Sequence, residues 1–130
     1  MQGTVDPRRM GLTYLEGRVR GPAGETTVTF LVDSGAQFTL LPHDVWTTIG
    51  IIPKRMKDFA LADNTVIRRA MSECYVEFEF GDGHTPVILG EPMDTVPLLG
   101  VLTIEQFGLV LDPIRRSLQE ARNLLMRISA

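Results

Sequence analysis

Residues 28–42 read VTFLVDSGAQFTLLP, in which a run of β-branched and aromatic residues leads directly into Asp-Ser-Gly at positions 33–35. Alternate residues of the stretch Val28–Val32 are apolar, which predicts a strand with one buried face. Asp, Ser and Gly each favour turns for local reasons, so the triplet alone also fits an ordinary β-turn. A carboxylate at the end of a buried strand is costly, however, unless it has a partner or a purpose. The setting of the triplet therefore favours a functional role for Asp33.

Gly, Pro, Asp and Asn punctuate the chain on both sides of this segment, and most stretches between them read as strands. Residues 12–20 alternate between apolar and polar residues. The turn-forming sequence GPAG at 21–24 joins them to residues 26–32, so that the two runs predict a hairpin. Further on, residues 39–41 predict a short strand, and residues 42–49 predict a helix that starts with proline and stops before glycine.

The middle of the chain predicts two further hairpins. Residues 59–71 contain Asp63-Asn64 between two short extended runs, which is typical of a hairpin tip. Residues 74–80 alternate with period two and predict a strand with an apolar face. The dipeptide Asp82-Gly83 is a strong turn signal, and residues 85–89 are expected to return as the partner strand.

Towards the C-terminus the pattern is less regular. Residues 103–107 predict a short helix, with Thr103 and Gln106 spaced as a capping box and Gly108 as the stop. The remaining predicted elements are a short apolar run at 96–100, a strand at 109–112 and a tail at 114–130 that fits a helix or a strand equally well. The chain is therefore expected to be mostly β, with one or two short helices, and to form a single domain over residues 1–130.

Three segments, in order, resemble retropepsin-like aspartic proteases, the retroviral-type enzymes of clan AA, and most of all their small single-domain bacterial and archaeal members. The segments are FLVDSGA followed by TLLP (30–42), LADNT (61–65) and LGVLTIEQFGLVLDP (99–113), the last preceded by Leu98. The resemblance covers roughly residues 12–113 and fades in the tail, 114–130. Two positions depart from the commoner pattern of the clan: Ser34 replaces threonine, and Asn64 stands where glycine is frequent.

The resemblance implies an all-β, retropepsin-like acid protease barrel in which residues 28–42 and 87–107 form two related halves. It also implies a set of site residues. These are a catalytic Asp33, a loop supported by Ser34, Gly35, Ala36, Leu98, Leu99 and Gly100, and a flap over the substrate formed by Ala62, Asp63, Asn64 and Thr65.

The chemistry of this class explains why one aspartate per chain predicts a homodimer. Two carboxylates hold one water: the ionised one acts as base and the protonated one polarises the scissile carbonyl. Two like charges at about 3 Å cannot both ionise, so they share a proton. A chain with one Asp-Ser-Gly must take the second carboxylate from a symmetry mate. The expected function is endopeptidase cleavage of extended peptides by an Asp33/Asp33′ pair, with no metal or organic cofactor, and the tail 114–130 is a candidate for the dimer interface.

Two alternatives stay open at this stage. The same fold could serve as a catalytically silent dimerisation or peptide-binding module, although an intact Asp-Ser-Gly argues against it, because a silent interface has no reason to keep a costly carboxylate pair. The chain could also act only within a larger parent chain. The sequence does not give the cleavage specificity, the physiological substrate or the pH optimum.

Composition excludes several other functions. The net charge of −3 is not concentrated in any basic block, so neither nucleic acid nor a membrane surface is an expected partner. Cys74 is the only cysteine and has no partner for a disulfide or a zinc site, and His43 and His84 belong to no metal or nucleophile motif. No apolar leader is apparent at the N-terminus, and a cytoplasmic location is expected.

Overall fold

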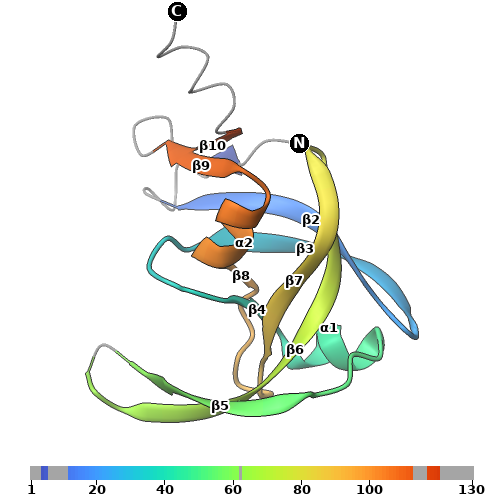
Figure 1. Ribbon diagram of the computed structural model, residues 1–130, viewed down its shortest axis with the longest axis vertical. Coiled ribbons are helices and arrows are strands. Elements are labelled where there is room, and N and C mark those ends of the chain that lie inside the picture. The colour runs from blue at the N-terminus through green and yellow to red at the C-terminus, as the bar shows by residue number, and fades with distance from the viewer. Residues whose placement is uncertain (1–3, 6–11, 62, 113–116, 121–130) are drawn as a thin grey trace, which may run out of the picture.

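The computed structural model describes residues 4–5, 12–61, 63–112 and 117–120 (Figure 1). As predicted, it is mostly β with two short helices, α1 (His43–Thr48) and α2 (Val101–Gln106). The strands are β1 (Thr4–Val5), β2 (Thr13–Gly21), β3 (Gly24–Val32), β4 (Thr39–Leu41), β5 (Arg55–Ala60), β6 (Val66–Phe78), β7 (Gly81–Leu89), β8 (Leu98–Leu99), β9 (Leu109–Asp112) and β10 (Ser117–Glu120).

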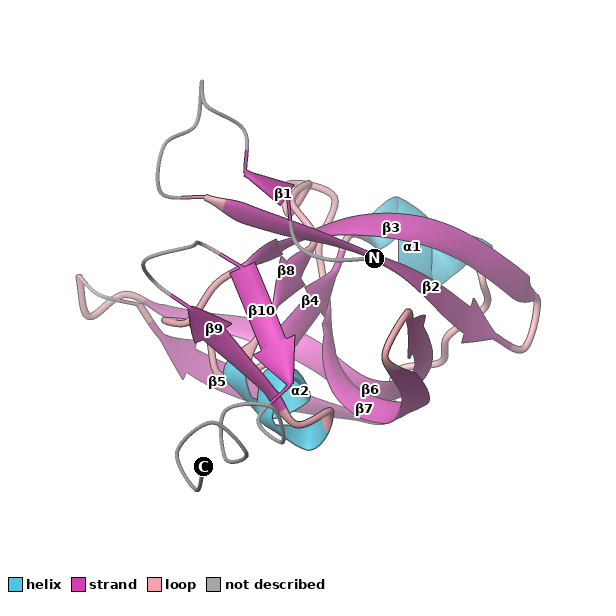
Figure 2. Ribbon diagram, turned by 90° about the horizontal axis from the view of Figure 1, so that it is seen from above, coloured by secondary structure: helices cyan, strands magenta, loops and turns pink. Residues whose placement is uncertain are grey.

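The strands close into a barrel. In the main sheet they follow the order β1-β2-β3-β8-β4-β7-β6-β5, and β6 also pairs with β2. This second pairing joins residues 18–20 to residues 75–77, and it closes β2, β3, β8, β4, β7 and β6 into a ring of six strands. In Figure 2, β2 and β3 lie on one side of the ring and β6 and β7 on the other, with β4 and β8 between them. The predicted all-β, retropepsin-like barrel is therefore confirmed.

The same order of elements occurs twice in the barrel. In the first half β3, a loop, β4 and α1 follow one another, and in the second half β7, a loop, β8 and α2 do so. Strand β3 pairs in parallel with β8, β4 pairs in parallel with β7, and β4 and β8 meet at Leu40 and Leu98. The predicted relation between residues 28–42 and 87–107 is thus visible in the topology.

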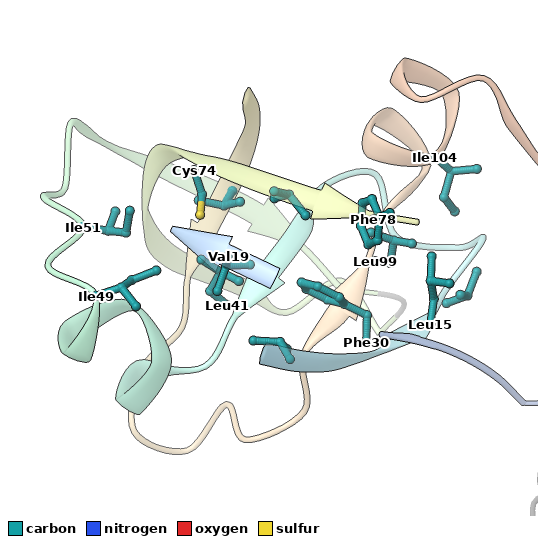
Figure 3. Packing of buried hydrophobic residues seen from close by; sticks show 14 of the residues in the cluster. Leu15, Val19, Phe30, Leu41, Ile49, Ile51, Cys74, Phe78, Leu99 and Ile104 are labelled. Carbon is teal, nitrogen blue, oxygen red and sulfur yellow. The ribbon is translucent and has the colours of Figure 1, made fainter. Parts of the chain in front are cut away.

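The core fills the inside of the ring (Figure 3). Phe30 and Phe78 pack with their ring centroids 6.2 Å apart, and both are almost fully buried. Around them lie buried aliphatic side chains from every strand of the ring, among them Leu15, Val19, Leu41, Val76, Leu89 and Leu99. Burial of this apolar surface is the main stabilising contribution to the fold, and it fixes β3 and β8 as a rigid base for the loop that follows β3.

The turn predicted at Asp82-Gly83 was wrong. Phe78 pairs with Gly81, so the hairpin turns at residues 79–80, and Asp82 and Gly83 already lie in β7, opposite Glu77 and Val76. The register is set by packing rather than by local turn preference, because the Phe78 ring is held between other aromatic rings of the core.

The capping box predicted at Thr103 and Gln106 was also wrong. The helix begins earlier, with Gly100 as its N-cap, and no side chain caps it. Thr103 lies inside the helix with its hydroxyl buried, and the Gln106 amide donates a hydrogen bond to the carbonyl of His84. Gly108, with φ of 67°, follows the helix as its predicted stop.

Two stretches differ in extent from the prediction. The extended runs within residues 59–71 belong to a longer hairpin, in which β5 starts at Arg55 and β6 continues to Phe78. The strand predicted at 74–80 is the end of β6, and it stops two residues earlier than predicted because residues 79–80 form the turn. In Figure 1 this hairpin projects away from the barrel. In the tail, residues 117–120 form a strand antiparallel to β9, and the rest of 114–130 lies outside the described residues.

Candidate active site

Asp33 stands at the end of β3, on backbone that β8 holds in place. The Leu31 N–H donates to the Pro97 carbonyl over 2.9 Å, and the Asp33 N–H donates to the Leu99 carbonyl over 3.1 Å. Leu99 itself is completely buried. The position of the Asp33 backbone therefore follows from the parallel pairing of two core strands, which is a rigid way to place a side chain.

The loop then folds back on the carboxylate. The Gly35 N–H donates to Asp33 Oδ1 over 2.9 Å, and the Ala36 N–H donates to the Asp33 carbonyl over 3.1 Å. A Cβ atom on Gly35 would lie only 3.3 Å from the same Oδ1, so glycine allows this close approach. Asp33 is half-buried, whereas Ser34 and Gly35 are exposed. The carboxylate is thus held by its own loop in a partly exposed position.

Leu98, Leu99 and Gly100, which were predicted to support this loop, are next to it in the structure: the Leu99 carbonyl accepts the Asp33 N–H, and Gly100 lies against Phe38. The N–H groups of Val101 and Leu102 at the start of α2 donate to the carbonyls of Ala36 and Gln37 over 2.8 and 3.0 Å. A Cβ atom on Gly100 would lie 2.4 Å from the carbonyl carbon of Phe38, so no other residue fits there without moving the loop. Ser34, Gly35 and Ala36 thus rest on the second half of the barrel.

Three buried threonines support the site, and sequence reasoning missed them. Thr103 Oγ1 lies 2.6 Å from Thr39 Oγ1 and 2.8 Å from Thr85 Oγ1, and the Gly100 N–H donates to Thr39 Oγ1 over 3.0 Å. All three threonines are at most 1% exposed. The network joins β4, β7 and α2. The available signal was a threonine between apolar neighbours at positions 39 and 103, but Thr85 stands between His84 and Pro86, and the three residues are far apart in the sequence.

The tip of the β5–β6 hairpin has a well-defined turn. The Leu61 N–H donates to the Thr65 carbonyl, the Asn64 N–H to the Leu61 carbonyl, and the Thr65 N–H to Asp63 Oδ1, over 2.8 to 2.9 Å. Hydrogen bonding from Thr65 lowers the pKa of Asp63. Asn64 has φ of 69°, a left-handed conformation that Asn tolerates better than most residues, which explains how it can stand where glycine is frequent. Ala62 lies outside the described residues.

A cleft of about 450 Å³ lies between the Asp33 loop and the hairpin. The loop contributes residues from Gly35 to Leu40 and β5 contributes residues 57–60, followed by Leu61, while Ile88 and Leu98 come from the barrel. Of the predicted site residues, Gly35, Ala36 and Leu98 line this cleft. Asp33 and Ser34 lie next to it in the sequence but do not line it, nor do Leu99, Gly100, Asp63, Asn64 and Thr65. The residues that sequence reasoning missed here are Gln37, Phe38, Leu40, Lys57, Asp58, Phe59, Ala60, Leu61, Ile67, Arg69, Ile88 and Asp94.

An ion pair between two of its lining residues forms part of the cleft wall. Arg69 Nε lies 2.7 Å from Asp94 Oδ2, and the two side chains are 12% and 21% exposed. The Glu91 N–H also donates to Asp94 Oδ2, over 2.8 Å. Burial acts to raise the pKa of Asp94, but the hydrogen bonds from Arg69 and Glu91 and the charge of Arg69 outweigh it, so that the pKa lies below its ordinary value. The pair ties β6 to the loop before β8.

Other residues with reactive side chains serve the packing. The His43 ring meets the edge of Trp46, whose indole N–H donates to the Gly90 carbonyl over 2.9 Å. Burial raises the pKa of the Cys74 thiol to about 11, which keeps it protonated and unreactive. Within the part of the chain that the structure describes, no cluster of His, Cys, Asp and Glu could hold a metal ion, and no helix is long and apolar enough to cross a membrane.

Comparison with known proteins supports the fold. No protein-family model and no curated protein sequence matches the chain. Among solved structures, the chain is similar to a retropepsin-like aspartic protease from Rickettsia conorii, with a TM-score of 0.63 and 19% sequence identity over 91% of this chain and 86% of the other. At this identity the similarity shows a shared fold.

Proposed function

We propose that the protein is an aspartic endopeptidase that acts as a homodimer, in which two copies of Asp33 activate one water. The observation that carries this proposal is the Asp33 carboxylate itself, held by the Gly35 N–H at the end of a core strand and only partly buried. Such a fixed carboxylate matches a reaction that needs a base in a defined place. The shared fold with a retropepsin-like aspartic protease supports the same function.

The reaction needs two carboxylates, and this chain supplies one. In the second half of the barrel, the loop before β8 also carries an aspartate, Asp94, but Arg69 and the Glu91 N–H already engage its oxygens. The second reactive carboxylate therefore has to come from another copy of the chain. Ser34 and Gly35 are exposed beside Asp33, so a second copy can approach the loop, and the tail 114–130 is a candidate for further contacts.

The mechanism then follows the two protonation states of the pair. The ionised carboxylate takes a proton from the water, whose oxygen attacks the carbonyl carbon of the scissile peptide bond. The protonated carboxylate gives its proton to the carbonyl oxygen. When the tetrahedral gem-diol collapses, the C–N bond breaks and the leaving nitrogen takes the proton from the protonated carboxyl group. One hydroxyl of the gem-diol gives its proton to the ionised carboxylate as the new carbonyl forms, so the pair again holds one proton. No metal or organic cofactor takes part in these steps.

The substrate is an extended stretch of polypeptide. The cleft between the loop and the β5–β6 hairpin has the size for side chains of a bound peptide. The hairpin would lie over that peptide, bind its backbone and exclude water. In this proposal residues 1–130 form one protease domain, with its core at about 12–113. The proposed location of the enzyme is the cytoplasm.

The first prediction concerns Asp33→Asn. The change removes a charge and keeps the shape, so we expect a folded dimer that no longer cleaves peptides, with the rate lowered by at least about a thousandfold. Cleavage of a diverse peptide library from about pH 4 to 7 by both proteins measures this. Activity in Asp33→Asn would rule the mechanism out. A wild-type protein that is folded and dimeric but silent would instead favour a dimerisation or peptide-binding module.

A further inference from the structure

The cleft beside Asp33 has an apolar floor and one charged wall. Leu40, Ile88 and Leu98 come from the barrel strands, and the aromatic rings of Phe38 and Phe59 meet edge to face with centroids 6.0 Å apart. The opposite wall is one face of the β5–β6 hairpin. Because residues directly opposite on paired antiparallel strands share a face, the pairs Lys57–Arg69 and Phe59–Ile67 lie on this face together.

Two of the four charged residues that line the cleft are cations on the same face, directly opposite one another: Lys57 and Arg69. Like charges in this position repel unless each is compensated. Arg69 is compensated by Asp94 at 2.7 Å, and the fourth charged residue, Asp58, pairs with Arg68 at 2.9 Å on the other face. These contacts use up both carboxylates of the cleft.

Lys57 has no such carboxylate among the residues that the structure describes. Its Nζ lies 4.7 Å from the centroid of the Phe38 ring and 5.8 Å from that of Phe59. The ammonium group therefore lies over the two aromatic rings. A ring face, however, does not satisfy all three N–H donors of a lysine. The cleft thus carries one uncompensated positive charge next to apolar surface.

We propose that Lys57 determines specificity by selecting peptides with a Glu or Asp side chain close to the scissile bond. This inference rests on the proposed function, because it treats the cleft as the place where the peptide binds. A bound carboxylate would receive hydrogen bonds from the ammonium group, while the methylenes of the same side chain lie against Phe38 and Phe59. A two-fold dimer has one such cleft on each side of the Asp33 pair, so the preference is expected on both sides of the cut.

The experiment compares pairs of peptides that differ only by Glu against Gln, placed in turn at each of the four positions on either side of a cleaved bond. Wild type should cleave the Glu member roughly two- to fivefold faster in kcat/KM, the range expected for a single solvent-accessible charge pair. Lys57→Met should bring this ratio to about one, and Lys57→Glu should reverse it. High salt should weaken the wild-type ratio. Lys54→Met is the matched control, because Lys54 is exposed, pairs with Glu73 and lies outside the cleft, and it should leave the ratio unchanged.

A second readout separates the failure of this inference from the failure of the proposed function. The same peptide pairs are titrated against Asp33→Asn, with and without Lys57→Met, and binding is followed by fluorescence anisotropy. Cleavage that does not depend on Asp33 would count against the proposed function alone. If wild type cleaved the Glu and Gln peptides equally fast, and the two peptides also bound equally tightly, the proposed role of Lys57 would be overturned. A Glu preference that survives Lys57→Met would overturn it as well.

Discussion

The hydroxyl of Thr103 links three elements beneath the Asp33 loop. It contacts the hydroxyls of Thr39 and Thr85, and Thr39 in turn accepts the N–H of Gly100, whose backbone lies against the loop at Phe38. Among the described residues, no buried side-chain nitrogen or oxygen lacks a partner. A buried network in which every polar group is hydrogen-bonded gives one arrangement of the surrounding backbone a lower free energy than the alternatives. The precision of the site thus depends on a residue that does not touch it.

Thr103→Val tests this network. Valine has the same shape but no hydroxyl, so Thr39 and Thr85 would lose their shared partner inside the core. We expect the free energy of unfolding to fall by about 1–3 kcal/mol, the usual cost of leaving buried polar groups unpaired. Urea denaturation at neutral pH measures the change. Thr29→Val serves as the control, because Thr29 is exposed on β3, and its effect should stay within about 0.5 kcal/mol. Equal stabilities of the two variants would show that the network is not needed.

The β5–β6 hairpin is an element that leaves the barrel and is tied back at its base. Strand β5 is mostly exposed and is the edge of the sheet, whereas most residues of β6 are buried or half-buried. The Arg69–Asp94 pair connects β6 to the loop before β8, which leads into the strand under Asp33. This pair therefore joins the hairpin to the segment that leads into β8, while at the tip the N–H groups of Leu61, Asn64 and Thr65 are bonded within the turn.

Asp94→Asn tests the anchor through the pH dependence of stability. The pKa of Asp94 in the folded protein lies below its ordinary value of 3.8. A carboxyl group whose pKa is lowered on folding stabilises the folded protein at pH values above its ordinary pKa. This stabilisation is lost as the pH falls through 3.8 towards the pKa of the folded state. We expect Asp94→Asn to cost about 1–2 kcal/mol at pH 7 and to lose less further stability than wild type between about pH 5 and 3. Urea denaturation at several pH values gives both quantities.

Asp58→Asn provides the comparison for this experiment. Asp58 is also paired with an arginine, Arg68, but both side chains are more than half exposed. Solvent screens such a pair, so its removal should change the stability at pH 7 much less than the removal of Asp94. If the two variants behaved alike, the Arg69–Asp94 contact would be an ordinary surface pair and not an anchor.

Local sequence patterns predicted most of the elements, and long-range contacts explain where they failed. The strand before Asp33, the short strand 39–41 and the helix after it follow from alternation, proline and glycine within a few residues. The turn of the β6–β7 hairpin depends on Phe78 packing against Phe30 and Phe107, which no local pattern reveals. The role of Thr103 depends on Thr39, 64 residues away. The charge balance at Lys57 likewise requires knowing that Arg69 and Asp94 meet.

The barrel is built from two similar halves that differ in the loop that carries an aspartate. Both halves run from a long strand through a loop to a short strand and a helix. Both aspartates are half-buried, but Asp33 in the first loop is held by the backbone N–H of Gly35, whereas Asp94 in the second loop is paired with Arg69. The internal symmetry of the chain therefore does not complete the site, and a second molecule is required for the proposed chemistry.

Mixing wild type with Asp33→Asn tests whether two molecules share one site. If each dimer needs both aspartates, wild-type chains that pair with the variant become inactive. With an equal amount of variant and free exchange of subunits, the activity of a fixed amount of wild type should fall to about half, and further as more variant is added. A chain that acts alone would keep its full activity. Sedimentation equilibrium over the same concentrations must show the dimer in parallel. A strictly monomeric protein that still cleaves would place both catalytic groups within one chain and would contradict the proposed pair, since the two carboxylates that line the neighbouring cleft, Asp58 and Asp94, are already paired with arginines.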